Sequence, residues 1–113
     1  MDQNLDTAAK WLMRAATAGN VNAMLALGVA YSQKGWLSTN TRTSALWYKS
    51  AAALKNAEGL YQYALLRDLG IGIVKNRDEA TQMMVLAAQL GHADARLWVS
   101  KNRNRVNRTV SKQ

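Results

Sequence analysis

Apolar residues recur along this chain at steps of three and four, a spacing that places them on one face of an α-helix. In the first such stretch the recurring positions are Ala8, Trp11, Leu12, Ala15 and Ala16, and we expect all of them to face inward. The same spacing returns along the rest of the chain. The pattern predicts an all-α fold, with helices at about 7–18, 22–33, 42–54, 57–68, 78–90 and 93–102.

Glycines and capping residues divide these helices from one another. Gly19 and Gly91 follow the first and fifth predicted helices, as expected of residues that stop a helix in the left-handed conformation. Lys55 stands at the equivalent place after the third helix, so that turn must form without glycine. Asn76, with Glu79 three residues later, predicts a capping box, and Asp94 predicts a cap for the last helix.

The helices form an internal repeat. Pairs of alanines stand at 15–16, 51–52 and 87–88, with a spacing of 36 residues both times. A shift of 36 residues aligns further positions without a gap: Trp11, Trp47 and Met83 in the first helix, and Asn20, Asn56 and His92 in the turn. We therefore expect three helix–turn–helix copies in which Trp11, Trp47 and Tyr48 are mainly core residues.

One such helix pair cannot bury its apolar face alone, whereas stacked copies can. The expected fold is a right-handed α-solenoid of about three repeats of 36 residues. We expect a repeat domain over residues 1–100, with repeats at about 5–40, 41–76 and 77–100, and a basic C-terminal tail over residues 101–113. The end repeats should fray first.

The motifs within one repeat resemble those of a known family. The first copy carries Ala8-x-x-Trp11-Leu12-x-x-Ala15-Ala16, and the turn before the third copy carries Gly70-x-Gly72 ahead of Asp78. Together these motifs resemble the Sel-1-like repeat, whereas the tetratricopeptide repeat has a shorter period. The resemblance implies a non-catalytic, protein-binding adaptor or regulator. Because some bacterial members act in toxin-neutralising or secretion systems, it also implies an immunity or inhibitor protein as one form.

Composition excludes several classes of protein. The 113 residues include no proline and no cysteine, so a disulfide framework, a thiolate nucleophile and a Cys-ligated zinc site are excluded. His92 is the only histidine, and we interpret it as a turn residue. The glycines of Gly70-x-Gly72 are better explained by a tight turn than by a phosphate loop. No residues form a catalytic constellation, so we expect no enzyme, no cofactor and no metal.

The outward positions of the first helix in each copy are the candidate partner-binding residues. They change from basic in the first copy to apolar in the third, which would suit an acidic, partly apolar protein or peptide. The alternative is a solvated face that also stacks on a missing fourth copy. Trp36 either anchors a partner or folds back onto the helices. The candidate residues are Lys10, Met13, Arg14, Trp36, Leu46, Lys49, Gln82 and Val85.

The net charge of +8 is concentrated near the C-terminus. The tail contains Lys101, Arg103, Arg105, Arg108 and Lys112 and no acidic residue. Three interpretations stay open: a solvated, disordered end; an extension of the last helix that caps the solenoid; and a segment that binds nucleic acid or an anionic surface.

No signal peptide or membrane-spanning run is present in the sequence. We expect a cytoplasmic protein, or a secreted or periplasmic one if a leader is removed before residue 1. It would be a monomer or associate weakly through exposed repeat ends.

Overall fold

The computed structural model describes residues 3–111, and all the regular structure in that range is helical. The all-α fold class is therefore confirmed. The helices lie within a few residues of their predicted positions, except that α1 begins earlier and α2 ends earlier. Their bounds are α1 Gln3–Thr17, α2 Val21–Ala30, α3 Thr41–Ala53, α4 Ala57–Leu69, α5 Arg77–Gln89, α6 Ala93–Lys101 and α7 Arg103–Ser111.

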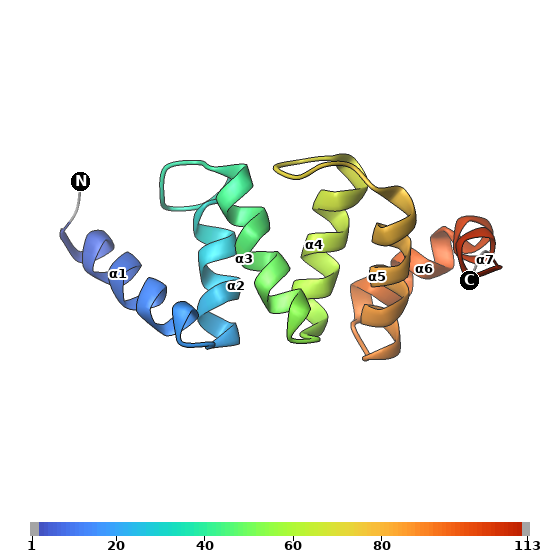
Figure 1. Ribbon diagram of the computed structural model, residues 1–113, viewed down its shortest axis with the longest axis horizontal. Helices are drawn as coiled ribbons and strands as arrows, with labels where there is room; N and C mark the ends of the chain where they lie inside the picture. Colours follow the sequence, from blue (N-terminus) through green and yellow to red (C-terminus); the bar gives the residue numbers. More distant parts are fainter. Residues whose placement is uncertain (1–2, 112–113) are drawn as a thin grey trace.

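Consecutive helices from α1 to α6 pack against one another, and the whole stack is elongated, with dimensions of 51 × 22 × 20 Å (Figure 1). The hairpins α1–α2, α3–α4 and α5–α6 are the three predicted helix–turn–helix units. Two apolar clusters form the core. The first includes Ala16, Leu27 and Ala51, with Trp47 packed against it, and the second includes Tyr63 and Met84. The predicted α-solenoid is thus present.

The turns inside the three hairpins have the same geometry. The backbone N–H groups of Gly19, Lys55 and Gly91 each donate to the carbonyl three residues earlier, at 2.9–3.0 Å. All three residues have positive φ, of 98°, 61° and 96°. The predicted left-handed glycine stops are confirmed, and in the second turn Lys55 adopts the left-handed region despite its side chain.

Side chains at equivalent positions cap the helices that follow these turns. Asn20, Asn56 and His92 accept hydrogen bonds from the backbone N–H three residues on, at 2.8–3.1 Å. The predicted cap by Asp94 is wrong, because His92 occupies the capping position and Asp94 lies in the first turn of α6. Asn76 caps α5 as predicted, by accepting from the backbone N–H of Glu79 at 3.0 Å. The other half of the predicted capping box is wrong, because the Asn76 N–H donates to the carbonyl of Arg67 at 2.9 Å and the Glu79 carboxylate binds the Arg67 guanidinium.

The connections between hairpins differ from one another. After α2 the chain forms a loop over residues 31–40, and Leu37 donates to the carbonyl of Ala30, which ends the helix earlier than the periodicity predicts. After α4 the chain turns through Gly70 and Gly72, both with positive φ (71° and 74°). The interpretation of Gly70-x-Gly72 as a tight turn is confirmed.

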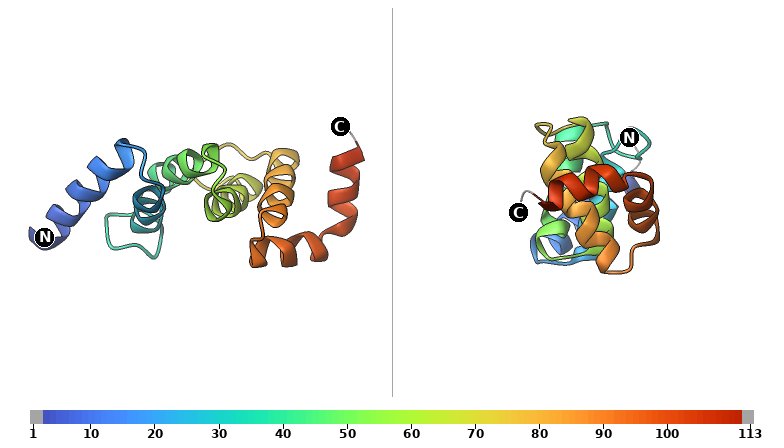
Figure 2. Two further views of the ribbon diagram at one scale, coloured as in Figure 1. Left: turned by 90° about the horizontal axis from the view of Figure 1, so that it is seen from below. Right: turned by 90° about the vertical axis from the view of Figure 1, so that its right-hand side faces the viewer.

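The described part of the basic tail, residues 101–111, is helical apart from a break at Asn102, while Lys112 lies outside the described residues. The tail does not extend α6. Instead α7 turns sharply away from α6 and returns beside α5 (Figure 2).

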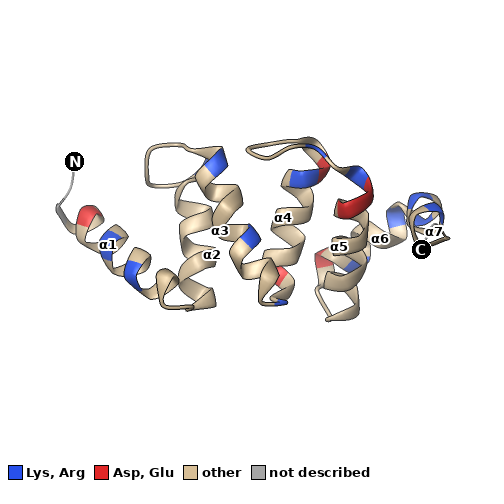
Figure 3. Ribbon diagram, viewed as in Figure 1, with Lys and Arg blue, Asp and Glu red and all other residues tan. Residues whose placement is uncertain are grey.

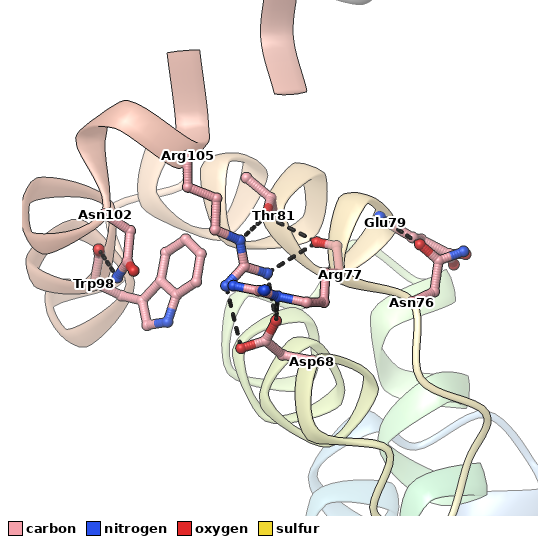
Figure 4. A network of polar contacts seen from close by, with 8 residues as sticks. All are labelled: Asp68, Asn76, Arg77, Glu79, Thr81, Trp98, Asn102 and Arg105. Carbon is pink, nitrogen blue, oxygen red and sulfur yellow. Dashed lines mark hydrogen bonds and ion pairs between the residues drawn. The ribbon is translucent and has the colours of Figure 1, made fainter. Parts of the chain in front are cut away.

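Thr109 of α7 is 4% exposed. Arg105 binds the carboxylate of Asp68 and donates to Thr81 Oγ1 at 2.9 Å (Figure 4). The interpretation of a disordered end is wrong for residues 103–111, and α7 covers this end of the solenoid.

The predicted core position of Trp11 is wrong. Its side chain is 63% exposed, and Ala8 on the same helix is also exposed. The physical reason is that α1 packs mainly against α2, and no described helix covers its other side. Tyr48 is buried and Trp47 is half-buried, as expected of core positions.

Candidate functional site

A groove with a volume of about 760 Å³ lies between α3 and α5. Lys49 and Lys55 contribute from α3 and the turn after it, while Gln82, Met83 and Leu86 contribute from α5. The remaining lining residues are Ala52, Ala53, Leu60, Tyr63, Asn76, Asp78 and Glu79. The groove therefore combines an apolar floor with charged walls.

Close packing of small residues positions α3, the first wall of the groove. A Cβ atom added to Gly28 of α2 would lie 2.6 Å from the ring of Tyr48, and one added to Gly59 of α4 would lie 2.6 Å from Ala51 Cβ. Both glycines thus let a neighbouring helix approach α3 closely. Ser44 also donates a hydrogen bond to the carbonyl of Gly28 at 2.5 Å. Helix α3 is consequently held from both sides (Figure 1).

An ion pair supports the second wall. Arg67 Nη2 lies 2.9 Å from Glu79 Oε2, and Arg67 Nη1 donates to the carbonyl of Val74 at 2.8 Å. This arrangement links α4, the following loop and the start of α5. The hydrogen bond to Glu79 raises the pKa of Arg67 above its usual value, so the guanidinium stays charged. Burial raises the pKa of the Tyr63 phenol, which stays neutral in the groove floor.

The groove has basic groups on one wall and acidic groups on the other. Lys49 and Lys55 are exposed on the α3 side, and within residues 3–111 neither forms an ion pair. Asp78 and Glu79 stand at the start of α5, and Glu79 is already paired with Arg67. Figure 3 shows the blue and red segments of these helices. The lysines are therefore the charges most available to a partner.

The structure brings only two of the sequence-predicted binding residues, Lys49 and Gln82, into this groove. Leu46 is 52% exposed and Val85 is partly buried, and neither lines the groove. Trp36 is 39% exposed in the loop after α2, also away from the groove.

The candidates on α1 form a separate surface. Lys10, Met13 and Arg14 are all exposed. Met13 and Arg14 line a different hollow of about 410 Å³, and the Arg14 guanidinium lies 5.4 Å from the ring centre of Trp11. The α1 candidates therefore line a different hollow from Lys49 and Gln82.

Sequence reasoning misses most of the groove lining. Ala52, Ala53 and Met83 belong to the repeating apolar pattern, which predicts packing alone. Lys55 stands out in the sequence only as a turn residue that is not glycine. One signal could have identified these residues. In a repeat stack the first helices of successive copies lie near one another, so the C-terminal half of the first helix in one copy faces the first helix of the following copy.

His92 has two structural roles. Its Nδ1 accepts from the backbone N–H of Ala95, and its Nε2 lies 2.6 Å from Glu58 Oε1. Its ring also stacks on Tyr61, with centroids 4.5 Å apart. These contacts join α6 to α4 and support the interpretation of a turn residue. Among residues 3–111, no group of three or more potential metal-ligating side chains occurs.

Comparison with known proteins identifies the repeat. A family model described as Sel1 repeat matches residues 1–20, 21–56 and 57–92. The two complete matches have the predicted period, but each begins with the second helix of a hairpin. The boundaries at 5–40, 41–76 and 77–100 therefore stay a prediction.

Three solved structures share the fold. Helicobacter pylori cysteine rich protein B has a TM-score of 0.73 and 26% identity, with 80% of this chain and 68% of that chain covered. A Sel1 repeat protein from Oxalobacter formigenes has a TM-score of 0.74 and 32% identity, with 79% and 36% covered. Protein c5321, a protective antigen of uropathogenic Escherichia coli displaying an SLR fold, has a TM-score of 0.79 and 26% identity, with 84% and 20% covered.

One curated relative matches in sequence. Protein SHC1 of Saccharomyces cerevisiae is 27% identical over 84 residues, which are 74% of this chain and 16% of that protein. This chain thus spans a small part of that relative's length. In residues 3–111, no helix is long and apolar enough to cross a membrane.

Proposed function

Because this chain belongs to the Sel1 repeat family, we propose that it is a non-catalytic adaptor or regulator that binds another protein through the groove between α3 and α5. Sel1 repeat proteins are generally protein-interaction adaptors, and their solenoid fold is typically non-catalytic. The observation that carries the proposal is the groove itself, which combines an apolar floor with two lysines that form no ion pair within residues 3–111.

The chemistry of the groove favours an acidic, partly apolar segment of the partner. Apolar side chains of such a segment would pack on Met83 and Leu86, and its carboxylates would lie near Lys49 and Lys55. Complementary charges of this kind set orientation and association rate more than affinity. The apolar contacts would contribute most of the binding free energy.

A finer form of the proposal is an immunity or inhibitor protein of a bacterial toxin or secretion system. In that case the bound segment would belong to the toxin or enzyme, and occupation of the groove would block it. The family resemblance is the support for this form. It predicts that one cognate protein binds through this groove and loses its activity when bound.

Selection from a random peptide library tests the proposed groove directly. Peptides of about 12 random residues, displayed on phage, would be selected on the immobilised protein. We expect enrichment of sequences that combine Asp or Glu with large apolar residues. The double variant Lys49→Glu/Gln82→Trp reverses one charge and fills the groove, and should weaken binding of the selected peptides at least about tenfold, or roughly 1.4 kcal/mol.

A matched control makes the result specific to the groove. Lys34→Glu/Gln89→Trp introduces the same two residue types at exposed positions outside the groove. It should bind the selected peptides as the unmodified protein does. If both variants bind equally well, or if no acidic peptides are enriched, the proposed groove is wrong.

A further inference from the structure

The corner between α6 and α7 encloses a strongly basic cleft of about 380 Å³. Its cationic lining consists of Arg77, Lys101, Arg103, Arg105 and Arg108. A second hollow of about 290 Å³ shares Arg77, Arg105 and Arg108 with it, so the two hollows adjoin. Figure 3 shows basic segments gathered on α7. This surface lies at the end of the solenoid, and of its lining residues only Asp78 also lines the groove between α3 and α5.

Contacts with the repeat body hold the cleft in shape. Arg105 binds Asp68 and donates to Thr81 Oγ1 and to the carbonyl of Arg77 (Figure 4). Its guanidinium also lies 5.0 Å from the ring centre of Trp98. With Thr109 buried against the body, α7 is fixed in place. A ligand would therefore meet a preformed site and would not have to order the tail.

Most of the charge in the cleft is available. Asp68 is engaged by Arg105 and lies 3.8 Å from Arg77 Nε. The side chains of Lys101, Arg103 and Arg108 are exposed, and within residues 3–111 none of them forms an ion pair. No carboxylate lines the first hollow, and only Asp78 lines the second.

Arginine, more than lysine, makes up this surface. The cleft holds four of the eight arginines of the chain and only one of its seven lysines. The planar guanidinium donates two parallel hydrogen bonds to phosphate or carboxylate oxygens, whereas an ammonium acts as a point charge. The composition therefore favours an oxyanion ligand.

We propose that this arginine cleft binds the phosphate backbone of nucleic acid, without preference for sequence. Two adjoining hollows with five cations suit several consecutive phosphates better than one isolated anion. The concave shape suits a chain of phosphates better than a flat lipid surface. No aromatic side chain lines either hollow, so bases would not be stacked or read.

The test is fluorescence anisotropy with a labelled oligothymidylate of about 20 nucleotides at several salt concentrations. The triple variant Lys101→Gln/Arg103→Gln/Arg108→Gln removes exposed charges and leaves the contacts of Arg105 intact. This variant should bind the oligonucleotide at least about tenfold more weakly. The slope of log binding constant against log salt concentration should become shallower by about two, since each of the three lost phosphate contacts contributes about 0.7 to that slope.

The control variant Lys34→Gln/Arg42→Gln/Lys75→Gln removes the same net charge from exposed positions away from the cleft. It should bind nearly as well as the unmodified protein, and circular dichroism should show that both variants stay helical. Equal losses in both variants would overturn the proposal, because net charge alone would then explain binding. Absence of oligothymidylate binding, or cleft-dependent binding to phosphatidylglycerol vesicles only, would also overturn it.

Discussion

Helices α1 and α3 occupy equivalent positions in the repeat yet have different environments. Both carry a tryptophan four residues before an alanine pair, Trp11 in α1 and Trp47 in α3. Trp11 is 63% exposed, whereas Trp47 packs on the cluster of Ala16, Leu27 and neighbouring residues. Position in the repeat therefore determines which way a side chain faces, and the neighbouring helix determines whether it is buried.

The same difference explains why the groove lies where it does. Helix α3 has α2 on one side and α4 on the other, brought close by Gly28 and Gly59. Helix α5 stands beyond α4, so the outward residues of α3 and α5 line one hollow. Helix α1 packs mainly on α2, and its outward residues Met13 and Arg14 line a separate hollow.

The largest expected contrast is between truncations of the two tryptophans. Trp47→Ala should lower the free energy of unfolding by about 2–3 kcal/mol, because a large, half-buried side chain leaves the core. Trp11→Ala should cost at most about 1 kcal/mol, since it removes an exposed ring and its contact with Arg14. Urea unfolding followed by circular dichroism measures both.

Similar losses of unfolding free energy in Trp47→Ala and Trp11→Ala would contradict the difference in burial between the two tryptophans. They would mean that the outer face of α1 is covered in solution, for example by a second copy of the chain. Light scattering at the protein concentration of the unfolding experiment separates that case from a monomer with an exposed Trp11.

A smaller effect is expected from exchanging the turn residues of the first two hairpins. Lys55→Gly should raise the free energy of unfolding by about 0.5–1 kcal/mol, because it relieves the left-handed conformation of a residue with a side chain. Gly19→Lys should lower it by about 1 kcal/mol; no atom lies within 4 Å of the added Cβ, so the cost is conformational. If Lys55→Gly instead lowered the free energy of unfolding, contacts of the lysine side chain would outweigh the strain of its left-handed conformation.

Local signals in the sequence predict much of the fold. The roles of Gly19 and Gly91 and of the asparagines before the helices follow from the sequence, because each acts over a few residues. The 36-residue spacing of the alanine pairs reveals the repeat directly. The early end of α2 is not predictable in this way, because a hydrogen bond from Leu37 in the following loop terminates it. The exposure of Trp11 is also missed, since it depends on which helices lie beside α1.

The candidate site is predicted less well than the fold. Equivalent outward positions identify Lys49 and Gln82, but also positions such as Lys10 and Leu46 that do not reach the groove. The arginine cleft depends on α7 turning back beside α5 and on the contact of Arg105 with Asp68 of α4, which lies 37 residues earlier in sequence. Charge composition locates the basic residues, whereas their arrangement requires the tertiary structure.

Hydrogen–deuterium exchange with a selected acidic peptide tests the central claim most directly. The peptide, added at saturating concentration, should slow exchange of backbone amides in α3 and α5, which form the walls of the groove. Amides of α1 should exchange at the same rate with and without it. Protection confined to α1 or α7, with α3 and α5 unchanged, would contradict the assignment of the groove between α3 and α5 as the protein-binding site.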